Sequence, residues 1–134
     1  MEARKRSRAS AKAAGRNLEN DLCEALNAQG LKANRLRLKG SKDEGDVRSY
    51  LAEEHVFECK NTRTLSLSQW WKEAEKERDN AQAKYAWVVF KRHGTADING
   101  QWVLCTTGQL ATLLRELVDL RDEINRIQEA RIHG

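Results

Sequence analysis

The sequence contains no proline, only three cysteines, and no apolar run approaching the ~20 residues that a membrane span requires. The lack of proline is compatible with long uninterrupted helices, but it decides nothing about function. Cys23, Cys59 and Cys105 lie far apart and form no CxxC pair, which argues against a disulfide framework and against a structural zinc site. The histidines are equally scattered. Any bound metal is therefore expected to have oxygen ligands.

The length of 134 residues suits one domain with a single core. Hydrophobic residues make up 40% and charged residues 33%, which indicates a globular protein with a highly charged surface. No apolar stretch near the N-terminus resembles a signal peptide. We therefore expect a soluble cytoplasmic protein, in a prokaryote or a phage-infected host cell, that does not associate with a membrane.

The basic charge of the chain is concentrated at its N-terminus. Residues 1–16 carry six basic side chains and one acid, so they account for +5, and the other 118 residues sum to −1 within a total of +4. Such a segment suits contacts with a phosphate backbone, because each lysine or arginine contact releases counterions. We predict that residues 1–15 form a flexible DNA-binding arm. The alternative is a solubilising tail or a remnant of cloning.

Hydrophobic periodicity predicts the order helix, three strands, helix, strand, strand, helix. The expected helices cover residues 16–29, 67–83 and 109–131, and the expected strands cover 32–38, 46–51, 54–60, 85–91 and 101–106. The buried stripe of the second helix is expected to contain Trp70, Trp71, Ala74, Arg78 and Ala81 with Leu67. This order indicates an α/β domain with a small mixed sheet over residues 16–106, followed by a helical segment, 107–134.

The last predicted helix carries an apolar repeat spaced 3, 4, 3, 4, 3, formed by Leu110, Leu113, Leu117, Leu120, Ile124 and Ile127. This spacing is that of a coiled-coil seam over nearly three heptads. In a parallel pair, Glu116 of one copy would face Arg121 of the other. Leu114 and Val118 widen the stripe in its first half, so packing of the helix on its own sheet is the alternative. We expect a homodimer.

The predicted strand 54–60 combines an apolar face with a charged one. Glu58 and Lys60 are two residues apart and so point the same way. Asp46 begins the neighbouring strand, and the hairpin brings it within reach of Glu58. Two carboxylates and the backbone carbonyl of Cys59 would form a hard oxygen site for Mg²⁺, with Mn²⁺ expected to substitute. The alternative is an exposed salt bridge between Glu58 and Lys60, which would be worth little.

Such a site suits hydrolysis of a phosphodiester. A bound metal lowers the pKa of a water ligand and neutralises charge on the phosphate. Lys60 could orient the attacking water and stabilise the additional negative charge of the transition state.

The segments G-D-V (Gly45–Val47) and F-E-C-K (Phe57–Lys60) resemble the Asp…Glu-x-Lys motif of the PD-(D/E)xK nuclease superfamily. Glu19, at the border of the first helix's apolar stripe, is similar to the glutamate that supports metal binding in archaeal-type Holliday junction resolvases. The shared order of elements covers residues 16–91 and implies a restriction-endonuclease-like core. The chain departs from the family in having Gly45 where proline is usual, and its last strand and helix lie outside the shared core.

The resemblance implies that Asp46 and Glu58 bind the metal, that Lys60 acts on the attacking water, and that Glu19 is an outer or second-metal ligand. Ser41 matches loosely a serine that the family keeps near its site, and Gln69 resembles a polar residue common in the wider superfamily. Candidate DNA contacts are Arg4, Lys5, Arg6, Arg8, Arg35, Arg37, Lys39, Ser41, Lys42 and Gln69.

The leading hypothesis is an Mg²⁺-dependent, structure-selective endodeoxyribonuclease that resolves Holliday junctions in DNA recombination and repair by paired cuts. A second hypothesis is another nuclease of the same superfamily, acting on flaps, ends or specific duplex. A third is a non-catalytic, dimeric DNA-binding protein. The motif does not separate the first two, since they share every active-site residue.

Overall fold

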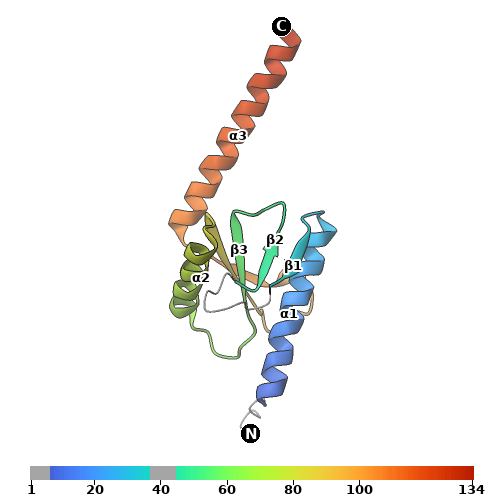
Figure 1. Cartoon of the computed structure of the whole chain (residues 1–134), viewed down its shortest axis with the longest axis vertical. Coiled ribbons are helices and arrows are strands. Elements are labelled where there is room, and N and C mark those ends of the chain that lie inside the picture. Colours follow the sequence, from blue (N-terminus) through green and yellow to red (C-terminus); the bar gives the residue numbers. More distant parts are fainter. Residues whose placement is uncertain (1–6, 37–44) are drawn as a thin grey trace. The chain divides into compact units, whose positions relative to one another are not determined.

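A computed structural model describes residues 7–36 and 45–134, and the chain divides into two compact units, one ending at Leu104 and one running Cys105–Gly134. The first unit contains, in order, α1 (Arg8–Ala28), β1 (Ala33–Arg35), β2 (Val47–Ser49), β3 (His55–Lys60), α2 (Leu67–Ala81), β4 (Tyr85–Phe90), the short 3-10 helix η1 (Ile98–Gly100) and β5 (Trp102–Leu104). The second contains α3 (Thr107–His133). Figure 1 shows these elements, whose order is the one predicted.

The five strands form one mixed sheet in the order β1-β2-β3-β4-β5. The β1–β2, β2–β3 and β4–β5 pairs are antiparallel, whereas β3 and β4 are parallel and are joined through α2. A helix between parallel neighbours is the expected crossover connection. In the β2–β3 hairpin Val47 lies opposite Phe57, so the residue before β2, Asp46, lies beside the second half of β3.

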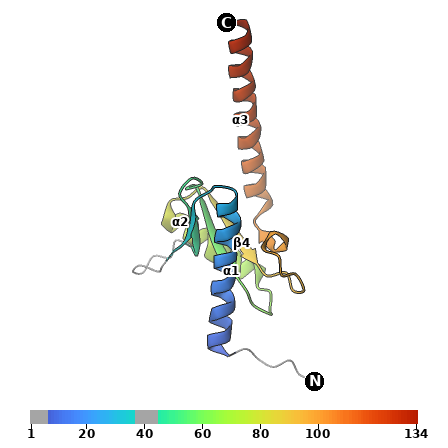
Figure 2. The ribbon, with the colours of Figure 1, turned by 90° about the vertical axis from the view of Figure 1, so that its right-hand side faces the viewer.

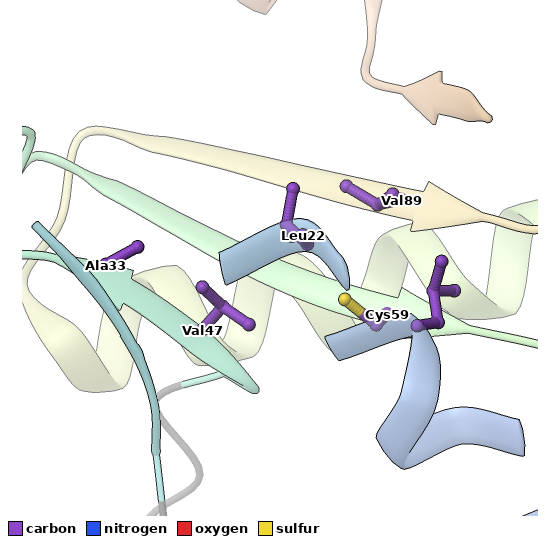
Figure 3. Packing of buried hydrophobic residues seen from close by; sticks show 6 residues of the cluster. Leu22, Ala33, Val47, Cys59 and Val89 are labelled. Atoms are coloured by element: carbon purple, nitrogen blue, oxygen red, sulfur yellow. The ribbon is translucent and has the colours of Figure 1, made fainter. Parts of the chain in front are cut away.

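The sheet is covered on both faces, by α1 on one and α2 on the other (Figures 1 and 2). The first core cluster joins α1 to the sheet through Leu18, Leu22, Ala33, Val47, Cys59 and Val89, most of which appear in Figure 3. The second joins α2 to the sheet through Val56, Trp70, Ala74, Ala86 and Val88. Alternation along β3 therefore turns Cys59 toward α1 and turns Val56 and Glu58 toward α2. The placement of Cys59 and Glu58 on opposite faces of the strand is the one predicted.

Helix α1 begins at Arg8, eight residues before the predicted start. Ser7 caps it, since its hydroxyl accepts a hydrogen bond of 3.1 Å from the amide of Ser10. The following segment is rich in alanine, lysine and arginine, which have high helix propensity, and Gly15 does not interrupt it. The helix ends at Ala28, one residue before the predicted end, and Gly30 follows it with a φ of +74°.

Helix α3 begins after Thr106, whose hydroxyl accepts a hydrogen bond from the amide of Gln109. Taken by itself, this helix exposes an apolar stripe made of Leu110, Leu114, Leu117, Val118, Leu120, Ile124 and Ile127. Two intrahelical ion pairs, Arg115–Asp119 and Arg126–Glu123, lie outside the 3–4 repeat. None of the helices in the described ranges is long and apolar enough to cross a membrane.

Candidate metal centre

Asp46 is fixed on the hairpin by the backbone of β3. Its amide donates to the carbonyl of Phe57 at 2.8 Å, and its Oδ2 accepts a hydrogen bond from the amide of Cys59 at 2.9 Å. Gly45 precedes it with a φ of +96°, and a Cβ atom there would lie 3.1 Å from the Phe57 carbonyl oxygen. Glycine is needed here, where the family pattern has proline, because the chain adopts a left-handed conformation in close contact with β3.

Glu58 and Lys60 lie on the face of β3 that α2 covers. Glu58 is only 8% exposed, and its Oε1 lies 3.6 Å from the Nζ of Lys60. The ammonium group of Lys60 binds Oε2 of Glu73, on α2, at 2.7 Å. The ion pair between Glu58 and Lys60 that the alternative assumed is present, but it is not exposed, because the side chains of Lys60 and Glu58 are only 22% and 10% exposed.

A second buried acid beside Glu58, Glu77 of α2, was not predicted from the sequence. It is 4% exposed, and its Oε2 lies 3.7 Å from the position that a Cβ atom on Gly45 would occupy. The helix was expected to bury Arg78, but Arg78 is half-buried and Glu77 takes the inward position with Trp70 and Ala74. Hydropathy could not choose between two adjacent charged residues.

The buried carboxyl groups disfavour one another's ionisation. Burial, followed by the charge of Glu58, raises the pKa of Asp46 from 3.8 to about 8. Burial, followed by the interaction with Glu77, raises the pKa of Glu58 from 4.5 to about 9. Both shifts have the direction expected for acids that share a low-dielectric site without a cation between them. Oε2 of Glu58 is buried, and no hydrogen-bond donor in residues 7–36 or 45–134 reaches it.

Lys60 keeps its charge in this environment. Burial by itself would lower the pKa of Lys60, but the hydrogen bond with Glu73 and the charges of Glu58 and Asp46 together raise it. The same hydrogen bond holds the pKa of Glu73 below its usual range. The site therefore presents a stable ammonium group beside two carboxyls that have a strong tendency to hold protons.

Glu19 has the half-buried place at the edge of the α1 stripe that was predicted, but its carboxylate is engaged by Arg35. Oε2 of Glu19 lies 2.9 Å from Nε of Arg35. The charge of Glu19 is the smallest of the five causes that shift the pKa of Asp46. In the described part of the chain, no group of three or more histidine, cysteine, aspartate or glutamate side chains has the arrangement of a formed metal site. The role of Glu19 as a ligand stays a prediction.

The other predicted site residues have different outcomes. Arg8 is the first residue of α1. Gln69, near the start of α2, donates a hydrogen bond of 3.4 Å from its Nε2 to Oε1 of Glu73. The side chain of Cys59 is buried in the core, where desolvation raises the pKa of its thiol, and the role of its carbonyl stays a prediction. The remaining predicted DNA contacts lie outside the described residues: Arg4, Lys5, Arg6, Arg37, Lys39, Ser41 and Lys42.

The donor set fits a hard divalent cation. Carboxylate oxygens are the ligands that Mg²⁺ prefers. Half-buried Asp46 and buried Glu58 offer them, and Oε2 of Glu58 has no hydrogen-bond donor among the described residues. A bound cation would relieve the repulsion that raises the two pKa values. No protein-family model, curated protein or solved structure matches the chain.

Proposed function

We propose that this protein is a metal-dependent DNA endonuclease of the PD-(D/E)xK type, with a restriction-endonuclease-like core. The observation that carries the proposal is the carboxyl pair of half-buried Asp46 and buried Glu58 beside the charged Lys60. Natural folds seldom bury acids that raise one another's pKa, unless the acids bind something or perform chemistry. The Asp…Glu-x-Lys spacing gives that pair a specific chemical interpretation.

Asp46 and Glu58 would hold Mg²⁺, with Mn²⁺ as a substitute. When bound, the cation would lower the pKa of a water and neutralise charge on the scissile phosphate. The backbone amide of Cys59 keeps Asp46 in place through its hydrogen bond to Oδ2, so this ligand is preorganised. The second ligand, Glu58, is positioned by the central strand β3 and cannot move without disturbing the core.

Lys60 would orient the attacking water and stabilise the negative charge that develops on the phosphate. Glu73 holds the ammonium group at 2.7 Å, which fixes the direction of a long and otherwise mobile side chain. Glu73 is partly exposed, so a phosphate group of the substrate could replace its carboxylate as the partner of the Lys60 ammonium group. The product is a hydrolysed phosphodiester.

The DNA-binding part of the proposal is supported by a row of basic side chains on α1. Arg8, Lys12 and Arg16 follow one another at intervals of four residues, so they share a face, and all three are exposed. Together with the net charge of +4, this row suits contacts with a phosphate backbone. Arg35 is a weaker candidate, because Glu19 already binds its guanidinium group.

We also propose that the protein acts as a homodimer that pairs through α3 and cuts branched DNA. Five of the six residues of the 3–4 repeat of α3 are exposed, and this spacing suits a second copy of the same helix: Leu110, Leu117, Leu120, Ile124 and Ile127. In a parallel pair Arg121 would face Glu116 of the partner. A two-fold dimer would carry two active sites, which suits paired cuts in a four-way junction of approximate two-fold symmetry.

The test is cleavage of a labelled four-way junction and of a matched linear duplex, each in Mg²⁺ and in EDTA. Symmetric nicks near the crossover, only in Mg²⁺, support the junction resolvase. Equal cutting of both substrates supports another nuclease of the same type and rejects junction selectivity. DNA binding without cleavage, unchanged by Lys60→Ala and Asp46→Asn, would leave the non-catalytic dimeric DNA-binding protein.

A further inference from the structure

An exposed tryptophan lies in the same cross-strand row of the sheet as Lys60. Lys60 pairs in register with Phe90 of β4, and Phe90 pairs with Trp102 of β5. Side chains of paired residues point to the same face of a sheet, so these three residues form one row on the face that α2 covers in part. Neighbouring strands are about 4.8 Å apart, so the strand positions of Lys60 and Trp102 are separated by about 10 Å.

Trp102 presents its ring to solvent together with a cation. The residue is 48% exposed, and the guanidinium carbon of Arg92 lies 4.6 Å from the centroid of its ring. Leu104, on the same face of β5, packs against the core, whereas Trp102 leaves about half of its surface in solvent. An exposed cation–π pair contributes little to folding stability, so stability gives little reason for a tryptophan at this place.

The loop between β4 and β5 holds the two residues side by side. The amide of Arg92 donates a hydrogen bond of 2.7 Å to Oε1 of Gln101, the residue before Trp102. Nε2 of the same glutamine donates to the carbonyls of Thr95 and Asp97, at 2.9 and 2.8 Å. One buried amide group therefore cross-links the loop. A ring and a cation fixed in this way lose little conformational freedom when they bind a ligand.

The surroundings of this pair are positively charged. The loops that follow β3 and β4 carry Arg63, Lys91 and Arg92, and no acid occurs in residues 59–72 or 84–96. In the described part of the chain, no carboxylate forms an ion pair with either of the two arginines. An exposed aromatic ring among cations complements a nucleotide, because the base stacks on the ring while the phosphates meet the positive charge.

We propose that Trp102 and Arg92 form a platform on which the protein stacks an unpaired base of its DNA substrate. The inference deepens the proposed function and rests on its DNA-binding part, since it names the kind of DNA that lies beside Lys60. Inside a continuous duplex both faces of each base are covered by its neighbours, so only an unpaired base can lie on the ring. The platform therefore favours branched DNA that has unpaired nucleotides at the branch over continuous duplex.

Fluorescence anisotropy in EDTA measures binding without cleavage. The labelled DNAs are a forked duplex with unpaired thymidine arms, single-stranded oligothymidine, and a continuous duplex. Trp102→Ala removes the ring, and Trp102→Phe keeps a smaller one. Tyr50→Ala is the matched control, because Tyr50 is an aromatic residue with 64% exposure that follows β2, near the start of β3 and away from Lys60.

We expect Trp102→Ala to weaken binding of the fork and of the single strand about tenfold and to leave duplex binding within about twofold of wild type. Trp102→Phe should recover most of the lost affinity, and Tyr50→Ala should bind all three DNAs within about twofold of wild type. Equal weakening on all three DNAs by Trp102→Ala, or an unchanged affinity for the fork, would overturn the inference. Cleavage of the fork by wild type in Mg²⁺ would still support the proposed function in that case.

The opposite result separates the two proposals as clearly. Loss of fork binding in Trp102→Ala, with no cleavage by wild type in Mg²⁺, would support the platform and reject the nuclease, and absence of DNA binding by wild type would overturn both. If Trp102→Ala does not fold, the wild-type protein still provides a test. On illumination, 5-iododeoxyuridine in the unpaired arm should cross-link to Trp102, and cross-links at other residues alone would refute the platform.

Discussion

Replacing Glu58 with glutamine should stabilise the metal-free protein at neutral pH while it abolishes cleavage. Burial and the neighbouring Glu77 raise the pKa of Glu58 from 4.5 to about 9. Below pH 4.5 the group is protonated in the folded and the unfolded chain, so its contribution to stability is fully present. As the pH rises toward 9 the unfolded chain releases the proton and the folded chain retains it, so the free energy of unfolding falls.

The size of the effect follows from the width of that window. Each pH unit in it is worth about 1.4 kcal/mol, so at pH 7 metal-free wild type has lost on the order of 3 kcal/mol through this one group. A glutamine has the shape of the protonated acid, can donate a hydrogen bond to a neighbouring carboxyl, and does not titrate. Because structural relaxation reduces such buried-charge effects, we expect Glu58→Gln to gain about 1–3 kcal/mol at pH 7.

Urea unfolding in EDTA at pH 5.5 and at pH 8 measures this difference. Glu58→Gln should exceed wild type in the free energy of unfolding by more at pH 8 than at pH 5.5. Glu75→Gln, which changes a largely exposed acid, should show the same pH dependence as wild type. Equal differences between Glu58→Gln and wild type at the two pH values would refute the argument that Glu58 is a strained acid in the metal-free protein.

Further changes test other parts of the structure. Lys60→Ala should reduce cleavage about 10²-fold or more and leave DNA affinity nearly unchanged, as measured by single-turnover kinetics and by fluorescence anisotropy. Gly45→Ala should destabilise the protein by about 2 kcal/mol in urea unfolding, and more than Gly30→Ala, since a Cβ atom meets the β3 backbone only at the first position. If the proposed dimer forms, wild type should sediment as a dimer in analytical ultracentrifugation and Leu117→Lys as a monomer, while Asp122→Lys, at a heptad position away from the seam, should stay dimeric.

The sequence predicts the order and the type of the α-helices and strands of the described fold, because periodicity and turn residues are local signals, but it does not predict the short 3-10 helix η1. Helix α1 begins eight residues before the predicted start, because Ser7 caps it and the alanine-rich segment that follows has high helix propensity. The sequence placed Arg78, and not Glu77, on the buried face of α2, and this error has a different cause. Which charged residue faces the sheet depends on a rotation of α2 that tertiary packing fixes, and no local pattern reports it.

The proximity of Asp46 to Glu58 could be predicted, because a hairpin register is determined over few residues. Contacts between distant elements could not. Glu73 is thirteen residues from Lys60, on a different element, and their ion pair depends on how α2 lies across β3. The Glu19–Arg35 pair likewise depends on the docking of α1 on β1.

The central claim is that Asp46 and Glu58 hold a divalent cation that cuts DNA with Lys60. The most direct measurement is the single-turnover rate of four-way junction cleavage by wild type and by Asp46→Asn, each at saturating Mg²⁺ and in EDTA. The account predicts cleavage by wild type in Mg²⁺ alone and a rate at least about 10²-fold lower for Asp46→Asn, with junction binding retained by both. Cleavage at the wild-type rate by Asp46→Asn, or equal cleavage by wild type in EDTA, would contradict it.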